Sequence, residues 1–456
     1  MSARRRAILV GLTAASVGVI YGYDLSSIAG ALLFLPNDFG LTIPEKGLVT
    51  TMVVIGQIVG ALAGGVLADA IGRKKSMVAI LIGYAVFALL GATAVSLPML
   101  FAARFLLGVT IGVSLVVVPV YVAESAPSAV RGRLLTAYQF ATLTGIILGY
   151  VVGYALAETI QSWRWMLGLA AVPATLLIPL LLRMPDTARW YVLKGRVEQA
   201  REALARVEPA DAVETDLAEI TAAVDEGRGT IGEMLRRPYL RATLFVVALG
   251  FLVQITGINA IVYYSPQLFS DMGFAGNFGK LGLPALVQVA ALAAVSVSLS
   301  LVDRLGRIPI LLSGIAMMIA ADAVLIAFYP KGSGQGGVAL ALGFGGVLLF
   351  TIGFNFGFGS LVWVFAGESF PSHLRSMGSS VMLTSNLIAN ALIAAFFLTL
   401  LDWLGGATVF AAFGVFAVVA FVVVHRFAPE TKGRQLEEIR YFWENGGRWP
   451  APAESS

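Results

Sequence analysis

Long apolar runs, separated by short polar stretches, occupy most of the chain. A helix needs about 20 apolar residues to cross the hydrocarbon core of a bilayer. Twelve runs are near this length, at 8–35, 47–68, 77–95, 98–122, 134–157, 163–183, 241–270, 282–302, 308–329, 338–366, 377–401 and 404–427. The first follows the basic residues Arg4–Arg6, as in a signal peptide, but it continues to Leu35, so we interpret it as an uncleaved span. The pattern predicts an all-α membrane protein with twelve transmembrane helices.

The composition agrees with this class and excludes several kinds of chemistry. Of the 456 residues, 58% are apolar and 13% are charged, whereas soluble domains have about 25% charged residues. Mean hydropathy is +0.85. Cysteine is absent and histidine occurs only twice, so we expect no disulfide, no metal centre and no cofactor. The net charge of +4 is better explained by cytoplasmic loops than by nucleic-acid binding.

Positive charges lie in alternate loops and at both ends of the chain. Cationic residues occur within 4–6, 73–75, 131–133, 183–241, 304–307 and 426–440 and at 375. The opposite loops carry few, namely Lys46, Arg164, Lys280 and Lys331. Loops rich in Lys and Arg stay in the cytoplasm. We therefore expect a multi-pass protein of the cell (inner) membrane, with both termini cytoplasmic.

Two different loop motifs each occur twice. The motif Asp-x-x-Gly-Arg occupies 69–73 after the second span and 303–307 after the eighth. The motif Glu-x-x-Pro-x-x-x-Arg occupies 124–131 after the fourth span and 368–375 after the tenth. Such a repeat predicts two parallel six-helix halves with a substrate site between them near mid-membrane. The expected parts are an N-terminal half (1–183), a cytoplasmic linker with short helices (184–240), a C-terminal half (241–430) and a cytoplasmic tail (431–456).

Five ordered motifs carry a family resemblance. They are Gly65 to Lys74, Pro119 to Arg133, Trp163 to Met166, Gln254 to Tyr264, and Pro429 to Gly433. With them, the chain resembles the sugar porter family of the major facilitator superfamily, of the bacterial proton/monosaccharide symporter type. The resemblance runs from Tyr21 to about Glu438. It implies the major facilitator fold and alternating-access transport of a sugar or polyol.

Asp24 lies deep inside the first apolar run, where a carboxylate costs about 2.5–3.5 kcal/mol. Arg104 is the other charge well inside the apolar part of the N-terminal half. At 1.5 Å per residue, both lie roughly 21–24 Å from the cytoplasmic side, so we expect them to pair. The resemblance implies that Asp24 is the protonation site of a symporter. A static structural ion pair is the alternative.

The resemblance also implies a sugar site. It assigns sugar ligands to Gln139, Gln254, Asn259 and Trp363, and an outer gate to Tyr263 and Tyr264. Amides can both donate to and accept from sugar hydroxyls, and aromatic rings pack against C–H faces.

Several of the family's ligand positions are replaced in this sequence. The replacements are Val253, Ile146, Ala291 and Leu383. We expect Gln288, Asn355 and Asn386, together with Asn390, to contribute to a rearranged set. A substrate that is smaller, less hydroxylated or differently oriented than glucose in the family's usual pose is therefore expected.

Charged residues recur at the cytoplasmic helix ends. They are Asp69, Arg73, Glu124, Arg131, Asp303, Arg307, Glu368, Arg375 and Glu430. In the family, such residues form salt bridges that tie the two halves together when the carrier faces outward. The stretch 186–190 keeps the charges of a further family motif but lacks its Ser-Pro, which predicts a weaker lock. Asp322 has no family counterpart, and we assign it a structural or neutral role.

These features favour proton-coupled symport of a hexose, pentose or polyol. A facilitative uniporter of the same fold remains an alternative, as does a non-transporting sugar sensor. The sequence has no nucleophile–base or metal constellation, so we expect no enzyme activity. The expected partners are a sugar or polyol, the proton and the lipid bilayer, and we expect a monomer that does not bind nucleic acid.

Overall fold

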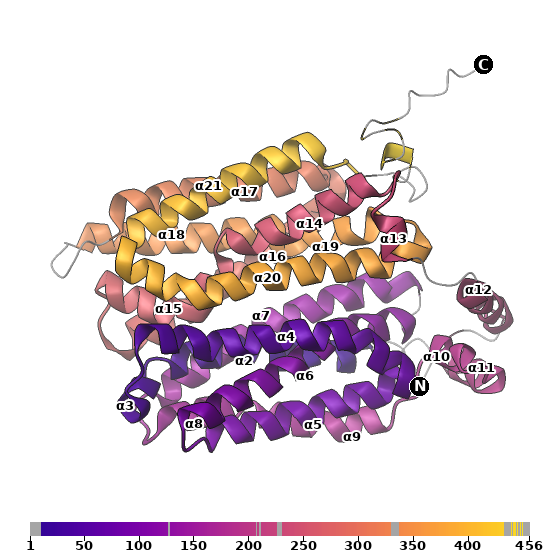
Figure 1. Cartoon of the computed structure of the whole chain (residues 1–456), viewed down its shortest axis with the longest axis horizontal. Helices are drawn as coiled ribbons and strands as arrows, with labels where there is room; N and C mark the ends of the chain where they lie inside the picture. The colour runs from indigo at the N-terminus through magenta and orange to yellow at the C-terminus, as the bar shows by residue number, and fades with distance from the viewer. Residues whose placement is uncertain are drawn as a thin grey trace. The chain divides into compact units, whose positions relative to one another are not determined.

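The computed structural model describes residues 11–125, 128–206, 208, 211–225, 230–329, 337–432, 439, 441–443, 445, 447 and 449. These residues are helical or lie in turns and connections, and none of them forms a strand (Figure 1). Eleven helical segments among them are long and apolar enough to cross a membrane. The remaining predicted span, 8–35, begins outside the described residues and is interrupted by a turn at Ser16, so its regular helix is short.

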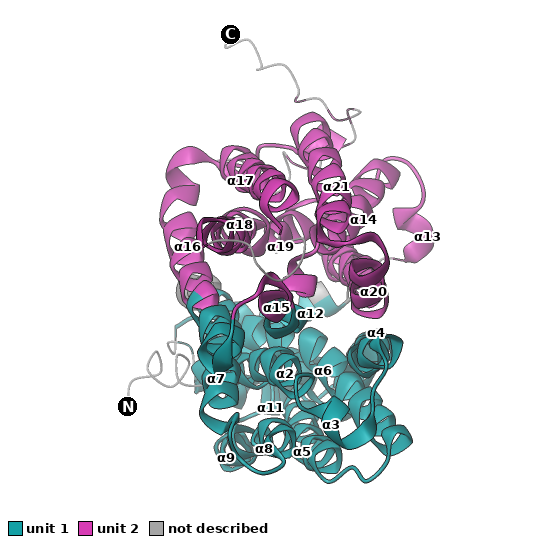
Figure 2. Cartoon of the chain, turned by 90° about the vertical axis from the view of Figure 1, so that its left-hand side faces the viewer, with its two compact units in different colours: residues 1–227, 262–267, 275–286 teal, residues 228–261, 268–274, 287–456 magenta. Residues whose placement is uncertain are grey.

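The chain divides into two compact units (Figure 2). The first comprises residues 1–227, 262–267 and 275–286. Its helices are α2 (Val17–Ala31), α3 (Leu35–Phe39), α4 (Ile43–Ile71), α5 (Arg73–Ala92), α6 (Leu97–Ser125), α7 (Ser128–Leu156), α8 (Ser162–Gly168), α9 (Ala171–Leu182), α10 (Ala188–Leu193), α11 (Val197–Ala205), α12 (Val213–Asp225) and the π-helix η1 (Phe278–Gly282).

The second unit comprises residues 228–261, 268–274 and 287–456. Its helices are α13 (Ile231–Met234), α14 (Leu240–Ile255), most of α16 (Leu283–Leu305), α17 (Arg307–Phe328), α18 (Gly337–Phe356), α19 (Phe358–Glu368), α20 (Ser372–Leu404) and α21 (Gly406–Phe427). Helix α15 (Ile258–Met272) has residues in both units. The predicted boundaries after 183 and 240 stay a prediction.

Glycines set the close approach of α4 and α6. A Cβ at Gly56 or Gly60 of α4 would lie 2.2 or 2.0 Å from a carbonyl oxygen of α6. A Cβ at Gly108 or Gly112 of α6 would lie 2.1 Å from a carbonyl oxygen of α4. Small residues allow transmembrane helices to pack backbone against backbone. This packing fixes the position of α6, which carries Arg104.

Two membrane helices are broken in mid-course. The first break separates α14 from α15 at Gly257, whose φ of 103° lies in the left-handed region that side chains disfavour. The second separates α18 from α19 at Gly357. In transporters, breaks of this kind free backbone groups beside the substrate site. Gln254 and Asn259 flank the first break.

The short helices expected in the linker are present. Helices α10, α11 and α12 bury a small apolar cluster of their own, which includes Ala200, Leu204 and Leu217. The Arg201 guanidinium bonds the Glu214 carboxylate at 2.6 Å and holds the pKa of that carboxyl below its ordinary value. Because both side chains are exposed, this pair adds little stability.

Candidate functional site

Asp24 and Arg104 form an ion pair in the core of the first unit. Nη1 of Arg104 lies 2.6 Å from Oδ1 of Asp24, and Nη2 lies 3.4 Å from Oδ2. Each residue is only 2% exposed. The predicted pairing is confirmed, and its geometry is a two-pronged fork on one carboxylate. Such planar bidentate contacts are the strong form of the arginine–carboxylate pair.

The pair is enclosed by apolar packing. Asp24 lies on α2 and Arg104 on α6. Around them, a core cluster contains Ile20 of α2, Leu81 of α5 and Leu107 of α6. A charge without its partner would be costly in this environment. The Nε of Arg104 has no hydrogen-bond partner among the described residues, so the bonds to Asp24 are the main interactions that offset the burial of the Arg104 charge.

Two pairs of amides join the broken helix α14–α15 to α20. Nε2 of Gln254 donates to Oδ1 of Asn386 at 3.2 Å, and Nδ2 of Asn259 donates to Oδ1 of Asn390 at 2.8 Å. Asn386 and Asn390 lie one turn apart on α20 and hold the two predicted ligands on either side of Gly257. Oε1 of Gln254 has no partner and can accept another hydrogen bond.

The other predicted ligands are not joined to these amides by any recorded contact among the described residues. Gln288 is 2% exposed and its Nε2 has no partner. Asn355 donates to the carbonyl of Thr351 in its own helix. Trp363 is 43% exposed. Gln139 is half-buried on α7 of the first unit.

Tyr263 and Tyr264, the predicted outer gate, are both buried on α15. Their rings meet edge to face, with centroids 6.2 Å apart. They fall within the 262–267 segment that belongs to the first unit. Within that unit, the hydroxyl of Tyr150 donates to the carbonyl of Val262. The gating role itself stays a prediction.

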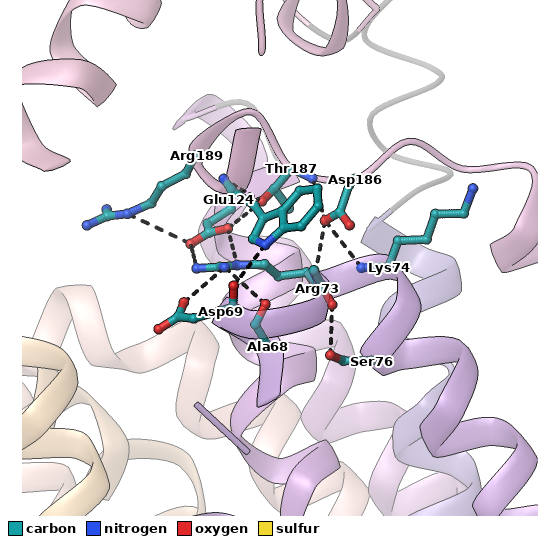
Figure 3. A network of polar contacts seen from close by, with 11 residues as sticks. Ala68, Asp69, Arg73, Lys74, Ser76, Glu124, Asp186, Thr187 and Arg189 are labelled. Carbon is teal, nitrogen blue, oxygen red and sulfur yellow. Dashed lines mark hydrogen bonds and ion pairs between the residues drawn. The ribbon is translucent and has the colours of Figure 1, made fainter. Parts of the chain in front are cut away.

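A polar network gathers at one end of the first unit (Figure 3). Arg73 bonds Glu124 through Nε at 3.0 Å and Nη2 at 3.3 Å, and its Nη1 lies 3.0 Å from Asp69. Asp186 accepts from the backbone N–H groups of Arg73 and Lys74 at 3.0 and 3.3 Å. These N–H groups begin α5 and have no partner within the helix, so the carboxylate caps it.

The stretch 186–190 after α9 supplies further bonds to this network, and the sequence did not predict those made by Thr187 and Trp190. The hydroxyl of Thr187 donates to Glu124 at 2.6 Å, and Nε1 of Trp190 donates to the carbonyl of Asp69 at 3.1 Å. Arg189 approaches Glu124 at 3.9 Å. Thr187 therefore bonds directly to the network in the stretch where the family's Ser-Pro is lost. The recurring charges around it were the available sequence signal.

The second unit repeats the carboxylate cap. Glu430 accepts from the backbone N–H groups of Arg307 and Ile308 at 3.0 and 2.9 Å, at the start of α17. Arg307 pairs with Asp303 at 3.5 Å. A Cβ at Gly306 would lie 2.8 Å from a Glu430 oxygen, as one at Gly72 would lie 2.2 Å from Asp186. The repeated Gly of the Asp-x-x-Gly-Arg motif thus makes room for the capping carboxylate.

The network role of three predicted members stays a prediction. Glu368 and Arg375 belong to no ion pair recorded among the described residues. The side chain of Arg131 lies outside the described residues. The recorded pairs join residues of the same unit, so ties between halves stay a prediction.

Asp322 is a buried carboxylate for which the described part of the chain supplies no hydrogen bond. It is 1% exposed on α17, and neither of its oxygens has a hydrogen bond. A Cβ at Gly414 of α21 would lie 3.4 Å from its Cβ. Its expected structural or neutral role stays a prediction.

The sequence and the fold agree with those of known transporters. A family model described as "Sugar (and other) transporter" matches residues 10–443. The chain belongs to this family of sugar transporters. The resemblance to sugar porters is thereby confirmed, and the family is one of transporters rather than enzymes.

Individual relatives cover most of the chain. It is 33% identical to the glucose transporter GlcP of Staphylococcus epidermidis over 439 residues, 95% of this chain and 96% of that protein. It is 32% identical to the galactose-proton symporter of Escherichia coli strain K12 over 433 residues, 93% and 92% of the two chains. The solved structure of the proton:xylose symporter XylE bound to 6-bromo-6-deoxy-D-glucose aligns with a TM-score of 0.82 and 26% identity, covering 97% of this chain and 100% of that one. The predicted major facilitator fold is confirmed.

Proposed function

We propose that this chain carries a monosaccharide or polyol across the membrane together with a proton, by alternating access. The observation that carries the proposal is the buried, bidentate Asp24–Arg104 pair. A static ion pair is expensive to keep inside a membrane, whereas a proton-binding carboxylate has a reason to be there. Relatives named as proton symporters of galactose and arabinose support the same reading.

Protonation of Asp24 would remove the charge that the Arg104 fork binds. The bidentate contact would then weaken, and Arg104 would be free to reorient on α6. A change of this kind biases a carrier between two states, because only one of them keeps the ion pair intact. A membrane potential of about 150 mV supplies roughly 3.5 kcal/mol per proton, enough for a sugar gradient of about 300-fold.

On the sugar side, the amides beside the α14–α15 break support hydroxyl recognition. Gln254 has a free acceptor and Gln288 a free buried donor, and a sugar hydroxyl can satisfy both kinds of group. Asn386 and Asn390 orient the neighbouring amides. Because Val253 and Ala291 cannot bond hydroxyls, we propose a substrate bound through fewer or different hydroxyls than glucose in the family's usual pose.

The proposal also covers the oligomeric state, the orientation in the membrane and the parts that move. We propose a monomer in the cell (inner) membrane with both termini in the cytoplasm. The six-helix halves 1–183 and 241–430 would move relative to each other, and the linker 184–240 would connect them. Tyr263 and Tyr264 would close the outer side. No enzyme activity, cofactor or nucleic acid is part of the proposal.

The proton role is tested with purified protein in proteoliposomes. A panel of D-glucose, D-galactose, L-arabinose, D-xylose and sorbitol should reveal uptake that rises with an inward proton gradient. The Asp24→Asn variant should lose concentrative uptake but keep exchange of labelled for unlabelled sugar, because its carboxyl can no longer bind a proton. Asp402→Asn, the same change at an exposed position on α20, should behave as wild type.

The panel also separates the alternatives. Uptake without any response to the proton gradient would leave facilitative transport. An Asp24→Asn protein that still concentrates sugar would exclude the proton role of this residue. Failure to take up or exchange any of these compounds would contradict sugar transport.

The amide pairs give a prediction about affinity. Asn386→Ala removes the acceptor that fixes the Gln254 amide, and we expect the half-saturating sugar concentration to rise by up to about tenfold, since one such bond is worth about 0.5–1.5 kcal/mol. The maximal exchange rate should change little. Initial rates of exchange against sugar concentration measure both. Thr384→Ala is the control, because its hydroxyl bonds only its own helix. An unchanged half-saturating concentration in Asn386→Ala would contradict this positioning role.

A further inference from the structure

Asp24 is sealed from solvent, yet the proposed function requires it to gain and lose a proton. It is 2% exposed, and both of its oxygens contact Arg104. Among the described residues, Arg104 is the side-chain partner recorded for both oxygens. Another set of groups must therefore carry the proton through the core of the first unit.

Three tyrosines from α2, α5 and α7 pack in the core cluster of the first unit, and Tyr21 lies three residues before Asp24 on α2. Tyr84 of α5 is fully buried, and its hydroxyl lies 3.2 Å from that of Ser114 on α6. Tyr21 of α2 and Tyr138 of α7 pack against the same core cluster that contains Tyr84. Tyr21 and Tyr84 each interact electrostatically with Asp24 and with Tyr138. The three rings thus converge on one small region.

Among the three tyrosines, Tyr138 is unusual in the bonding of its hydroxyl. It is buried and has no hydrogen-bond partner among the residues that the structure describes. Burying a hydroxyl without a bond costs about 1–3 kcal/mol, so a solely structural position would favour phenylalanine. The Tyr138 hydroxyl can instead complete a chain of hydrogen bonds with Tyr21 and Tyr84 when these side chains turn. On the other side, Tyr21 interacts electrostatically with Tyr263, the predicted outer gate.

Several other polar side chains of the first unit are already hydrogen-bonded. The hydroxyl of Tyr23 donates to the carbonyl of Met166 at 2.9 Å. Arg164 of α8 bonds the carbonyls of Ala92 and Ala94, both at 2.8 Å. Arg104 of α6 holds Asp24 itself, and α9 carries no titratable side chain. We therefore consider the tyrosine hydroxyls as the groups that transfer the proton.

We propose that Tyr21, Tyr84 and Tyr138 form a proton relay between the outer gate and Asp24, an inference that rests on the proposed proton symport. Each hydroxyl oxygen gains a proton from the side of the gate as its own O–H bond breaks and passes a proton onward. The Asp24 carboxylate gains one proton in total, and its bond to Arg104 weakens. Every tyrosine ends neutral, with its hydroxyl restored by rotation. No other reactant is consumed.

The test follows the protonation of Asp24 directly, without a sugar. The full-length protein in detergent is taken through a rapid drop in pH, and time-resolved infrared spectroscopy records the growth of the carboxylic-acid C=O band. The part of the band that is lost in Asp24→Asn belongs to Asp24. We expect Tyr84→Phe and Tyr138→Phe to slow its growth by about 100-fold, the low end of what a positioned proton-transfer group contributes.

These substitutions keep the ring, so the packing of the core should be preserved, and the thermal unfolding temperature checks this. Tyr154→Phe is the matched control, because Tyr154 lies on α7 like Tyr138 but is 46% exposed. It should keep the wild-type rate. In proteoliposomes, the two relay variants should lose proton-driven uptake while sugar exchange persists, which a general packing defect would not produce.

Two results would overturn the relay, and they can be told apart. If the band is lost in Asp24→Asn but grows at the wild-type rate in both single variants and in the double variant, the relay is wrong and proton binding at Asp24 stands. If Asp24→Asn keeps the entire band and its proton-driven uptake, both the relay and the proposed role of Asp24 are wrong.

Discussion

Arg104→Met should abolish sugar accumulation and lower the free energy of unfolding by about 3–5 kcal/mol, the usual cost of removing one partner from a buried pair. The Asp24 carboxylate would remain 2% exposed with neither of its recorded side-chain bonds. Methionine fills much of the space of arginine, so the loss reports the charge more than the volume. Thermal unfolding in detergent and uptake in proteoliposomes measure the two effects.

A second substitution tests whether the unpaired Asp24 charge causes the loss of stability. Adding Asp24→Asn to Arg104→Met removes the stranded charge, and stability should recover in part although accumulation stays lost. Arg104→Lys should be intermediate, because a lysine keeps the charge but cannot form the two-pronged contact. Arg241→Met, at an exposed position where α14 begins, is the matched control. A double variant no more stable than Arg104→Met would mean that the lost packing, not the charge, explains the defect.

The sequence could predict this pair because so few charges lie within apolar runs. Asp24 had a single candidate partner at a similar depth, and helix rise alone placed the two together. The same reasoning could not pair Gln254 with Asn386. Amides are tolerated at many places in membrane helices, and which of them meet depends on the rotation of α20 and on the break at Gly257. Neither is encoded in hydrophobic periodicity.

The network at the helix ends shows a different limit. Recurring charges predicted side-chain ion pairs, and Arg73 does pair with Glu124. The main bonds of Asp186 and Glu430, however, are to backbone N–H groups at the starts of α5 and α17. A motif made of side chains does not reveal which backbone N–H groups donate to its carboxylates. The repeated glycines at 72 and 306 were the sequence signal for this arrangement, because each leaves room for a carboxylate.

Gly60→Ala should destabilise the protein by about 3 kcal/mol, at the upper end of the usual cost of overpacking. The added Cβ would lie 2.0 Å from the carbonyl oxygen of Val109 on α6. Neither backbone can yield without moving the whole helix. A shift of α6 would also displace Arg104, so accumulation of sugar should fall with stability. Thermal unfolding and proton-driven uptake of the same preparation measure both.

Gly65→Ala provides the matched control on the same helix. No heavy atom lies within 4 Å of a Cβ at Gly65, so only the helix propensity of alanine should count. Alanine is favoured over glycine in a helix by about 1 kcal/mol, which makes this variant as stable as wild type or more so. If Gly60→Ala lowers the free energy of unfolding and Gly65→Ala raises it, the α4–α6 contact, rather than glycine flexibility, holds Arg104 in place. Equal effects would contradict that role, because flexibility is the property the two glycines share.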